Sequence, residues 1–316
     1  MSSARIFGIV AREANQVIVL RRGPSKYTQM LVWDLSTDQV TPGQWLKGRV
    51  YEKRCDVSPD GKHFVGCCSN YSQSHRKRFA GTANWEGSWI HCGWTVVSHP
   101  PYFTAVGLWL TGGAWNGGGV WKSNKHLAVN NFPHCWEERQ SPKGIQVSKL
   151  NLPMSEDDVY ELLLQQRGWK QQVILETEVV NPDWRERSKE MFGRLEKFLA
   201  DPSLIGEALA CEFASTIPQF RTSREGVWQK EFEKGRLFRR ESHDHEVWGL
   251  VSDRNQLVRE WRPKRFQAHW IDVDNDDRPI FGDNGCLWRW RRFPDGEPRM
   301  IADLNSNKFE NIAPPS

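Results

Sequence analysis

The chain has 316 residues and a net charge of +4, with 26% charged and 38% hydrophobic residues. This composition is typical of a soluble globular protein and excludes a disordered, collagen-like or membrane-embedded chain. The length allows one large domain or two of ordinary size. The positive charge is too small to indicate nucleic acid as a partner by itself, because nucleic-acid-binding domains are usually strongly basic. The chain is rich in tryptophan, with 17 residues that suit the packed faces of β-sheets.

The cysteines predict a reducing environment. There are seven of them, and none has C-x-x-C spacing, which is typical of free thiols rather than a disulfide framework. The apolar run Ile6–Val10 near the N-terminus is cut short by charge and lacks the features of a signal peptide. No apolar run is long enough to span a membrane, which takes roughly 18 residues. We therefore expect a cytoplasmic protein without a membrane partner.

The first part of the chain predicts short strands and tight turns. Four strands are expected in residues 5–48, at Ile6–Val10, Val17–Leu20, Met30–Leu35 and around Gln44–Leu46. The stretch Ser58-Pro59-Asp60-Gly61 then has turn chemistry, because proline presets φ and glycine accepts a positive φ. Strand-forming residues flank it at 50–57 and 63–65, so we expect a β-hairpin here.

These residues carry a resemblance to a known family. The turn Ser58–Lys62 followed by an apolar strand, with Met30–Asp38 upstream, resembles the repeat of TolB-like and WD40-like β-propellers. A similar order of apolar strand, acidic turn and apolar strand occurs at Trp270–Phe281. In that family such a turn joins two strands of one blade. The resemblance implies a propeller whose rigid faces bind partners.

Two segments between residues 69 and 121 have unusual composition. The polar stretch 69–87 contains the basic run His75–Arg78, which we interpret as a solvated loop tip. Residues 111–121 combine five glycines with Trp115 and Trp121, so the backbone could approach a ligand closely and the indoles could stack on it. The alternative is a flexible turn between strands. No dinucleotide-binding or P-loop fingerprint is present.

From residue 150 the pattern becomes helical. Ser155 followed by acidic residues predicts a helix through Val159–Gln166, and a strand is expected at Trp169–Val180. Two further helices are predicted, from Trp184 to about Ala200 and over Leu204–Ala214. We therefore divide the chain into N-terminal propeller blades (1–150), a helical insertion (151–225) and C-terminal propeller blades (226–316).

The last part of the chain predicts strands again and supplies most of the candidate binding residues. Aromatic and basic residues alternate around residues 261–266 and 288–293, which suits an acidic protein or a single-stranded nucleic acid. The predicted binding residues are Trp261, Arg262, Arg265, Arg289, Arg291, Trp115 and Trp121. The alternative is a strand with a tryptophan face in the core and a solvated arginine face.

The sequence contains no recognisable catalytic or metal motif. Carboxylates from Asp272 to Asp283 have spacing similar to a Ca²⁺ loop, but Asp277 replaces the glycine that the loop requires at its sharp turn. His243 and His245 lack an identifiable third ligand. No catalytic triad can be assembled from spacing. We therefore expect neither a cofactor nor a metal.

Together these patterns predict a mainly β, propeller-like fold of about five blades with a helical insertion. The alternative fold is a partial propeller or sandwich followed by a separate α+β domain. The predicted function is a non-catalytic interaction module or scaffold of a bacterial-type cytoplasmic protein, rather than an enzyme. Its expected partner is another protein of acidic character, with nucleic acid as the alternative. The competing function is a hydrolase similar to propeller glycoside hydrolases, with carboxylates in a central channel.

Overall fold

The protein is mainly β. The computed structural model describes residues 3–23, 26–79, 92–111, 117–130, 137–150, 155–178, 222–241, 246–262 and 270–314. In these residues the strands form five sheets, and every strand pair is antiparallel except one. The predicted fold class is therefore confirmed at the level of a mainly β protein. No helix among the described residues has the length and apolar character needed to cross a bilayer.

Sheet A contains the four strands predicted near the N-terminus. They are β1 (Arg5–Val10), β2 (Gln16–Arg22), β3 (Tyr27–Asp34) and β4 (Val40–Lys47), paired in chain order. Successive residues of β1 and β2 are buried, so the inner strands of this sheet are covered on both faces.

Sheet B has strand order β12-β9-β8-β7-β5, with β6 also paired to β7. Its strands are β5 (Arg49–Val50), β6 (Asp56–Val57), β7 (Phe64–Ser69), β8 (Gly93–Ser98), β9 (Ala105–Thr111) and β12 (Glu137–Gln140). The hairpin predicted around Ser58 is confirmed, because β6 and β7 pair on either side of that turn. A short 3₁₀ helix, η1 (Glu52–Arg54), interrupts the segment that was expected to be one strand.

A short helix corrects the loop predicted around His75–Arg78. Helix α1 spans Gln73–Phe79. The hydroxyl of Ser72 accepts a hydrogen bond from the His75 amide, which is the role of a helix N-cap. The basic run therefore lies on a capped helical turn rather than on an irregular loop tip.

Sheet C contains β10 (Gly119–Ser123), β11 (His126–Val129) and β13 (Gln146–Lys149). Strands β10 and β11 form a hairpin, whereas β11 and β13 are parallel.

Helix α2 (Glu156–Gln166) confirms the first predicted helix. Its capping box pairs the Ser155 side chain with the Asp158 amide and the Asp158 carboxylate with the Ser155 amide. The helices predicted from Trp184 and over Leu204–Ala214 lie outside the described residues.

The chain then forms sheets D and E, each with its strands paired in chain order. Sheet D contains β14 (Lys170–Glu178), β15 (Thr222–Phe232), β16 (Gly235–Glu241), β17 (Glu246–Ser252) and β18 (Leu257–Trp261). Sheet E contains β19 (Trp270–Val273), β20 (Pro279–Asp283), β21 (Cys286–Arg289) and β22 (Arg299–Asp303). Between β20 and β21, Asn284 and Gly285 both have positive φ, as a type I′ turn requires.

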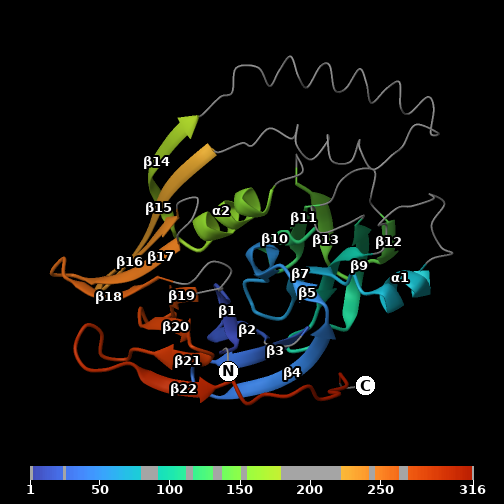
Figure 1. The fold of residues 1–316 in the computed structure, drawn as a ribbon, viewed down its shortest axis with the longest axis horizontal. Helices are drawn as coiled ribbons and strands as arrows, with labels where there is room; N and C mark the ends of the chain where they lie inside the picture. Colours follow the sequence, from blue (N-terminus) through green and yellow to red (C-terminus); the bar gives the residue numbers. More distant parts are fainter. Residues whose placement is uncertain are drawn as a thin grey trace, which may run out of the picture.

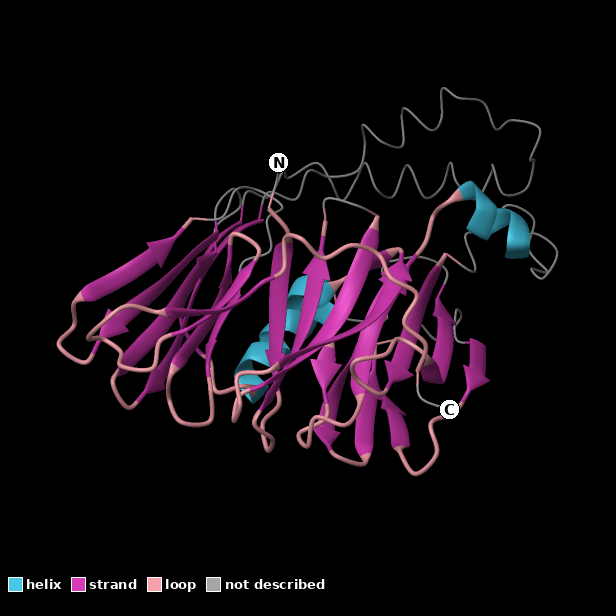
Figure 2. Ribbon diagram, turned by 90° about the horizontal axis from the view of Figure 1, so that it is seen from below, coloured by secondary structure: helices cyan, strands magenta, loops and turns pink. Residues whose placement is uncertain are grey.

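Sheets A and B, B and C, and D and E lie next to one another, whereas helix α2 lies between sheets C and D (Figure 1). Strand β1 contacts β6, and β10 contacts β6 and β7, so sheet A meets B and B meets C. Helix α2 contacts η1, β10 and β14 and lies among the strands, whereas α1 lies at the periphery (Figure 2). Sheet D meets sheet E through an ion pair between Lys230 and Asp272.

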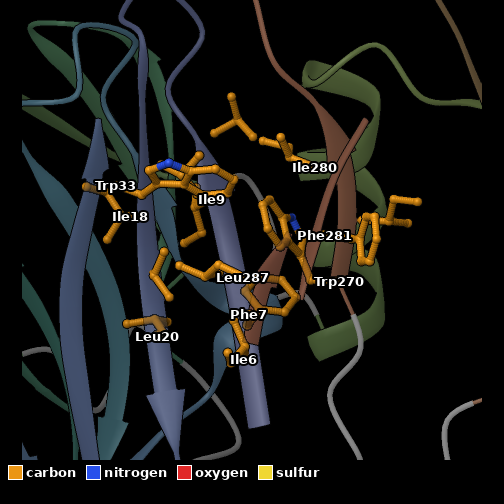
Figure 3. Close-up of a cluster of buried hydrophobic side chains, with 14 of the residues drawn as sticks. Ile6, Phe7, Ile9, Ile18, Leu20, Trp33, Trp270, Ile280, Phe281 and Leu287 are labelled. Atoms are coloured by element: carbon orange, nitrogen blue, oxygen red, sulfur yellow. The ribbon is translucent and has the colours of Figure 1, made fainter. Parts of the chain in front are cut away.

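The first and last sheets also pack against each other. Figure 3 shows the buried cluster at this interface, to which sheet A contributes Ile6 and sheet E contributes Trp270 and Leu287. The approach is close: a Cβ on Gly8 would lie 2.5 Å from the Trp270 ring, so β1 requires glycine at this position.

A buried ion pair crosses the same interface. Arg289 of β21 binds the Asp274 carboxylate within sheet E through both Nε and Nη2. Its Nη1 donates to the Leu35 carbonyl and to Asp38 Oδ1, both in the β3–β4 turn of sheet A, at 2.6 Å each. Because Arg289 is only 1% exposed, water does not screen these contacts.

We expect Arg289→Ala to lower the free energy of unfolding by about 3 kcal/mol, because the buried Asp274 would keep only Arg278 and Asp38 would keep only the exposed Arg291. Urea unfolding measures this. Arg291→Ala is the matched control: Arg291 also binds Asp38 but is exposed, so its loss should cost less than about 1 kcal/mol. Equal effects of the two variants would contradict the bridging role of Arg289.

Candidate functional site

The predicted binding residues do not form one exposed face. Trp261, Trp121 and Arg289 are buried, and Trp261 packs on Phe281 with ring centroids 5.0 Å apart. Arg265 and Trp115 lie outside the described residues.

The two predicted arginines that are exposed lie on different sheets. Arg262 follows β18 of sheet D and pairs with Glu260 at 2.6 Å, whereas Arg291 follows β21 of sheet E and pairs with Asp38. Strands β18 and β21 are not neighbours, so the structure does not bring these residues together in one sheet.

The carboxylates at the end of β19 and in the turn after it are bound by lysine and arginine side chains of the protein. Asp272 accepts a hydrogen bond from Lys230 Nζ at 2.6 Å. Asp274 is bound by Arg289 and by Arg278, whose Nε lies 2.9 Å from its carboxylate. Within the described part of the chain, no group of three potential ligands is arranged to hold a metal.

We expect millimolar Ca²⁺ to leave the thermal unfolding midpoint unchanged. The ion would have to displace Arg278 and Arg289 from Asp274, and this would leave the buried Arg289 guanidinium without the carboxylate that binds its Nε and Nη2. Differential scanning fluorimetry with and without Ca²⁺ measures the midpoint, and Mg²⁺ at the same ionic strength is the control. A rise of several degrees specific to Ca²⁺ would show binding to the native state.

The structure instead gathers basic residues where β1 begins and β2 ends, a group that we call the basic edge (Arg5, Arg22 and Arg49). Arg5 and Arg22 face each other across the β1–β2 pair, and β5, which begins with Arg49, contacts β3 of the same sheet. Burial lowers the pKa of Arg22, and the nearby Arg5 and Arg49 lower it further, whereas Glu52 opposes this. The guanidinium groups are therefore close enough to repel one another.

An aromatic ring holds one of these cations in place, and a second ring holds Lys53 of the adjoining η1. The Arg49 guanidinium lies over the Tyr51 ring, 4.5 Å from its centroid, and the Tyr51 hydroxyl accepts a hydrogen bond from Ser69. Lys53 Nζ lies 5.3 Å from the ring centroid of Tyr160 in α2. The Tyr51 ring is held in position by its hydrogen bond with Ser69, whereas Arg49 itself is exposed. Such an arrangement presents positive charge to a ligand with little loss of side-chain entropy on binding.

Sequence reasoning missed the basic edge. Arg5, Arg22 and Arg49 are far apart in the chain, and each has ordinary neighbours. One signal was available: once β1 and β2 are assigned as a hairpin around residues 11–15, the antiparallel register places Arg5 opposite Arg22.

Below this edge, two ion pairs attach α2 to sheet B. Arg54 contacts Glu156 at the start of the helix at 3.7 Å, and Asp56 contacts Arg167 after its end at 3.0 Å. Burial raises the pKa of Glu156, and Arg54 partly opposes this effect. Each charge faces an opposite charge, so these residues fasten the helix rather than form an acid–base pair.

Buried thiols surround this attachment. Burial raises the pKa of Cys67 to about 12 and that of Cys55 and Cys68 well above the usual range. The thiolate is the reactive form of cysteine, so these residues are chemically inert in the folded protein.

We expect Cys286, which is partly exposed, to be the first of the described thiols to react with Ellman's reagent in the native protein. Its pKa is also raised, by burial and by Asp303, so the reaction should be slow. The measurement uses a Cys135→Ser/Cys211→Ser background, because these two residues lie outside the described part of the chain. Unfolding in guanidinium chloride should release Cys55, Cys67, Cys68 and Cys92. Fast native labelling of any of those four would contradict the burial seen here.

Comparison with known proteins adds little. No family model and no curated protein matches the chain. Among solved structures, the chain is similar to Pyrococcus horikoshii acylaminoacyl peptidase (orthorhombic crystal form), with 11% sequence identity and a TM-score of 0.33. The match covers 96% of this chain but only 46% of that protein, so this chain spans less than half of its length. At this TM-score the likeness supports no conclusion about fold or function.

Proposed function

We propose that the five sheets are the blades of a propeller-like arrangement and that the protein is a non-catalytic interaction module. The turn Ser58–Lys62, whose sequence resembles the propeller repeat, joins β6 and β7 of one sheet. Consecutive sheets are in contact either directly or, for sheets C and D, through α2, and the last sheet packs against the first through β19, β20 and β1. Such an arrangement offers a rigid platform on which a binding surface needs no reorganisation.

The binding surface of this module is the basic edge, and its partner is an acidic segment of another protein. The observation that carries this proposal is the convergence of like charges at one edge, where Arg5 pairs with Arg22 across β1 and β2 and Arg49 begins β5, which contacts β3 of the same sheet. A carboxylate-rich ligand relieves that repulsion and forms charge-assisted hydrogen bonds with the guanidinium groups. The cluster is compact, and the net charge of the chain is only +4, which favours a protein segment over the long phosphate backbone of a nucleic acid.

The competing function, a hydrolase with paired carboxylates, has less support. The buried carboxylates Asp56, Asp272 and Asp274 are each bound by an arginine or a lysine. A glycosidase needs one carboxylic acid with a raised pKa beside a free carboxylate. In this structure these three carboxylates each join two elements of the fold.

The test uses a fluorescent octaglutamate peptide, with binding measured by anisotropy at low salt. Removing Arg22 and Arg49 together (Arg22→Ala/Arg49→Ala) should weaken binding about tenfold or more, since each charge-assisted contact contributes about 1.5–3 kcal/mol. Affinity for the wild type should fall as salt rises, because exposed charges are screened over about 10 Å at 0.1 M.

Arg262→Ala is the matched control, since it removes an exposed arginine of sheet D that already pairs with Glu260. Its affinity should equal that of the wild type. Oligothymidylate of the same charge serves as a competitor. Equal affinity in all three proteins would refute the basic edge as the site, and stronger binding of the oligonucleotide would identify nucleic acid as the partner.

A further inference from the structure

The turn Ser58–Lys62 joins three sheets at the end opposite the basic edge. The turn belongs to sheet B, and its Pro59 carbonyl accepts a hydrogen bond from the Glu13 amide of sheet A at 2.8 Å. The Asp60 amide donates to the Asn124 side chain of sheet C, also at 2.8 Å. Gln16 of sheet A donates to the Gly61 carbonyl at 2.6 Å. One turn therefore fixes the relative positions of sheets A, B and C.

His63, at the end of this turn, is packed between two rings. Its ring centroid lies 4.7 Å from that of His99, which follows β8, and 5.6 Å from that of Trp121 in β10. His63 Nδ1 is buried and has no hydrogen-bond partner. His99 differs, because it is exposed and its Nδ1 lies 3.1 Å from the Lys62 carbonyl.

The surroundings of His63 disfavour a positive charge on its ring. Burial lowers its pKa below the usual 6.5, and His99 and Lys62 lower it further, whereas Asp60 opposes them. The other charged residues near the joint are already engaged: Arg12 donates to the Trp121 carbonyl, and the Glu13 carboxylate accepts from Asn124. His63 is half-buried as a residue, but a proton on its buried Nδ1 would meet neither water nor an acceptor, so this edge of the ring would have to turn outward to become solvated.

We propose that His63, packed against the rings of His99 and Trp121, is a proton-sensitive joint that holds the three sheets together when neutral and releases the shared turn when protonated. This release follows from the linkage between proton binding to His63 and the stability of the closed state. The unfolded or opened state binds the proton near pH 6.5, and the closed state binds it only at lower pH. The stability that the neutral ring provides is complete above pH 6.5 and is lost as the pH falls below that value.

The test is native-state hydrogen exchange between pH 7.5 and 5.0, with rates corrected for the intrinsic effect of pH. The reporters are the amides of Glu13 and Asp60, which bridge the sheets. In the wild type we expect a several-fold loss of protection at these amides in acid. His63→Gln cannot be protonated, so its protection at the two amides should not change with pH.

His126→Gln is the matched control, because His126 lies in sheet C and bonds the Ser148 hydroxyl away from the joint. It should retain the acid response of the wild type. The imidazole titration of His63, followed by NMR in the wild type, keeps the proposal testable if His63→Gln fails to fold. A His63 pKa at or above 6.5 would overturn the proposal, as would an unchanged acid response in a folded His63→Gln protein.

Discussion

The structure depends on the contact between its first and last sheets. Each of the other sheets meets mainly its neighbours in the chain, as in a repeat protein, in which stability is a sum of local terms and cooperativity can break down. Sheet E ends this pattern by packing on β1. Arg289 of sheet E bonds Asp38 in the β3–β4 turn of sheet A, and Arg21 of sheet A donates to the Leu304 carbonyl that follows β22. Beyond β22, Asn307 bonds Gln29, and Phe309 packs on Tyr27 with centroids 4.7 Å apart. The two ends of the described chain are thus tied to each other.

Local turn chemistry explains why most strands could be predicted from sequence. Turns such as Ser58–Gly61 and Asn284–Gly285 fix the register of their own hairpins, and they need no information from the rest of the chain. Helix α2 could be predicted equally well from the sequence, because its capping box spans only four residues. Helix α1 was not, because the run Gln73–Phe79 has no apolar periodicity, and only Ser72 at its start indicates a helix.

The binding residues could not be predicted because the alternation rule assumes one solvated face. According to this rule, Trp288 and Trp290 lie on the buried face of the strand, and Arg289 lies on the other face, which is exposed to water. In sheet E, successive residues of β19 and β20 are buried, since sheet A covers one face and sheet D meets the other. Arg289 shares its face with Leu287, which faces sheet A, so its charge is buried there and needs Asp38 and Asp274. The structural role of such a buried arginine can be recognised only when it is known which sheets are neighbours.

The basic edge and the histidine joint lie at opposite ends of β1. Arg5 is the first residue of the strand, and Arg12 lies two residues after its end. Arg12 donates a hydrogen bond to the carbonyl of Trp121, and the His63 ring packs against the Trp121 ring. Six residues of strand extend about 20 Å. This exceeds the screening length of about 8 Å at physiological ionic strength, so a proton on His63 has little direct electrostatic effect on the basic edge. The two sites therefore act independently unless β1 itself moves. A binding affinity that changed with the protonation of His63 would mean that the joint positions β1, and with it the Arg5–Arg22 pair.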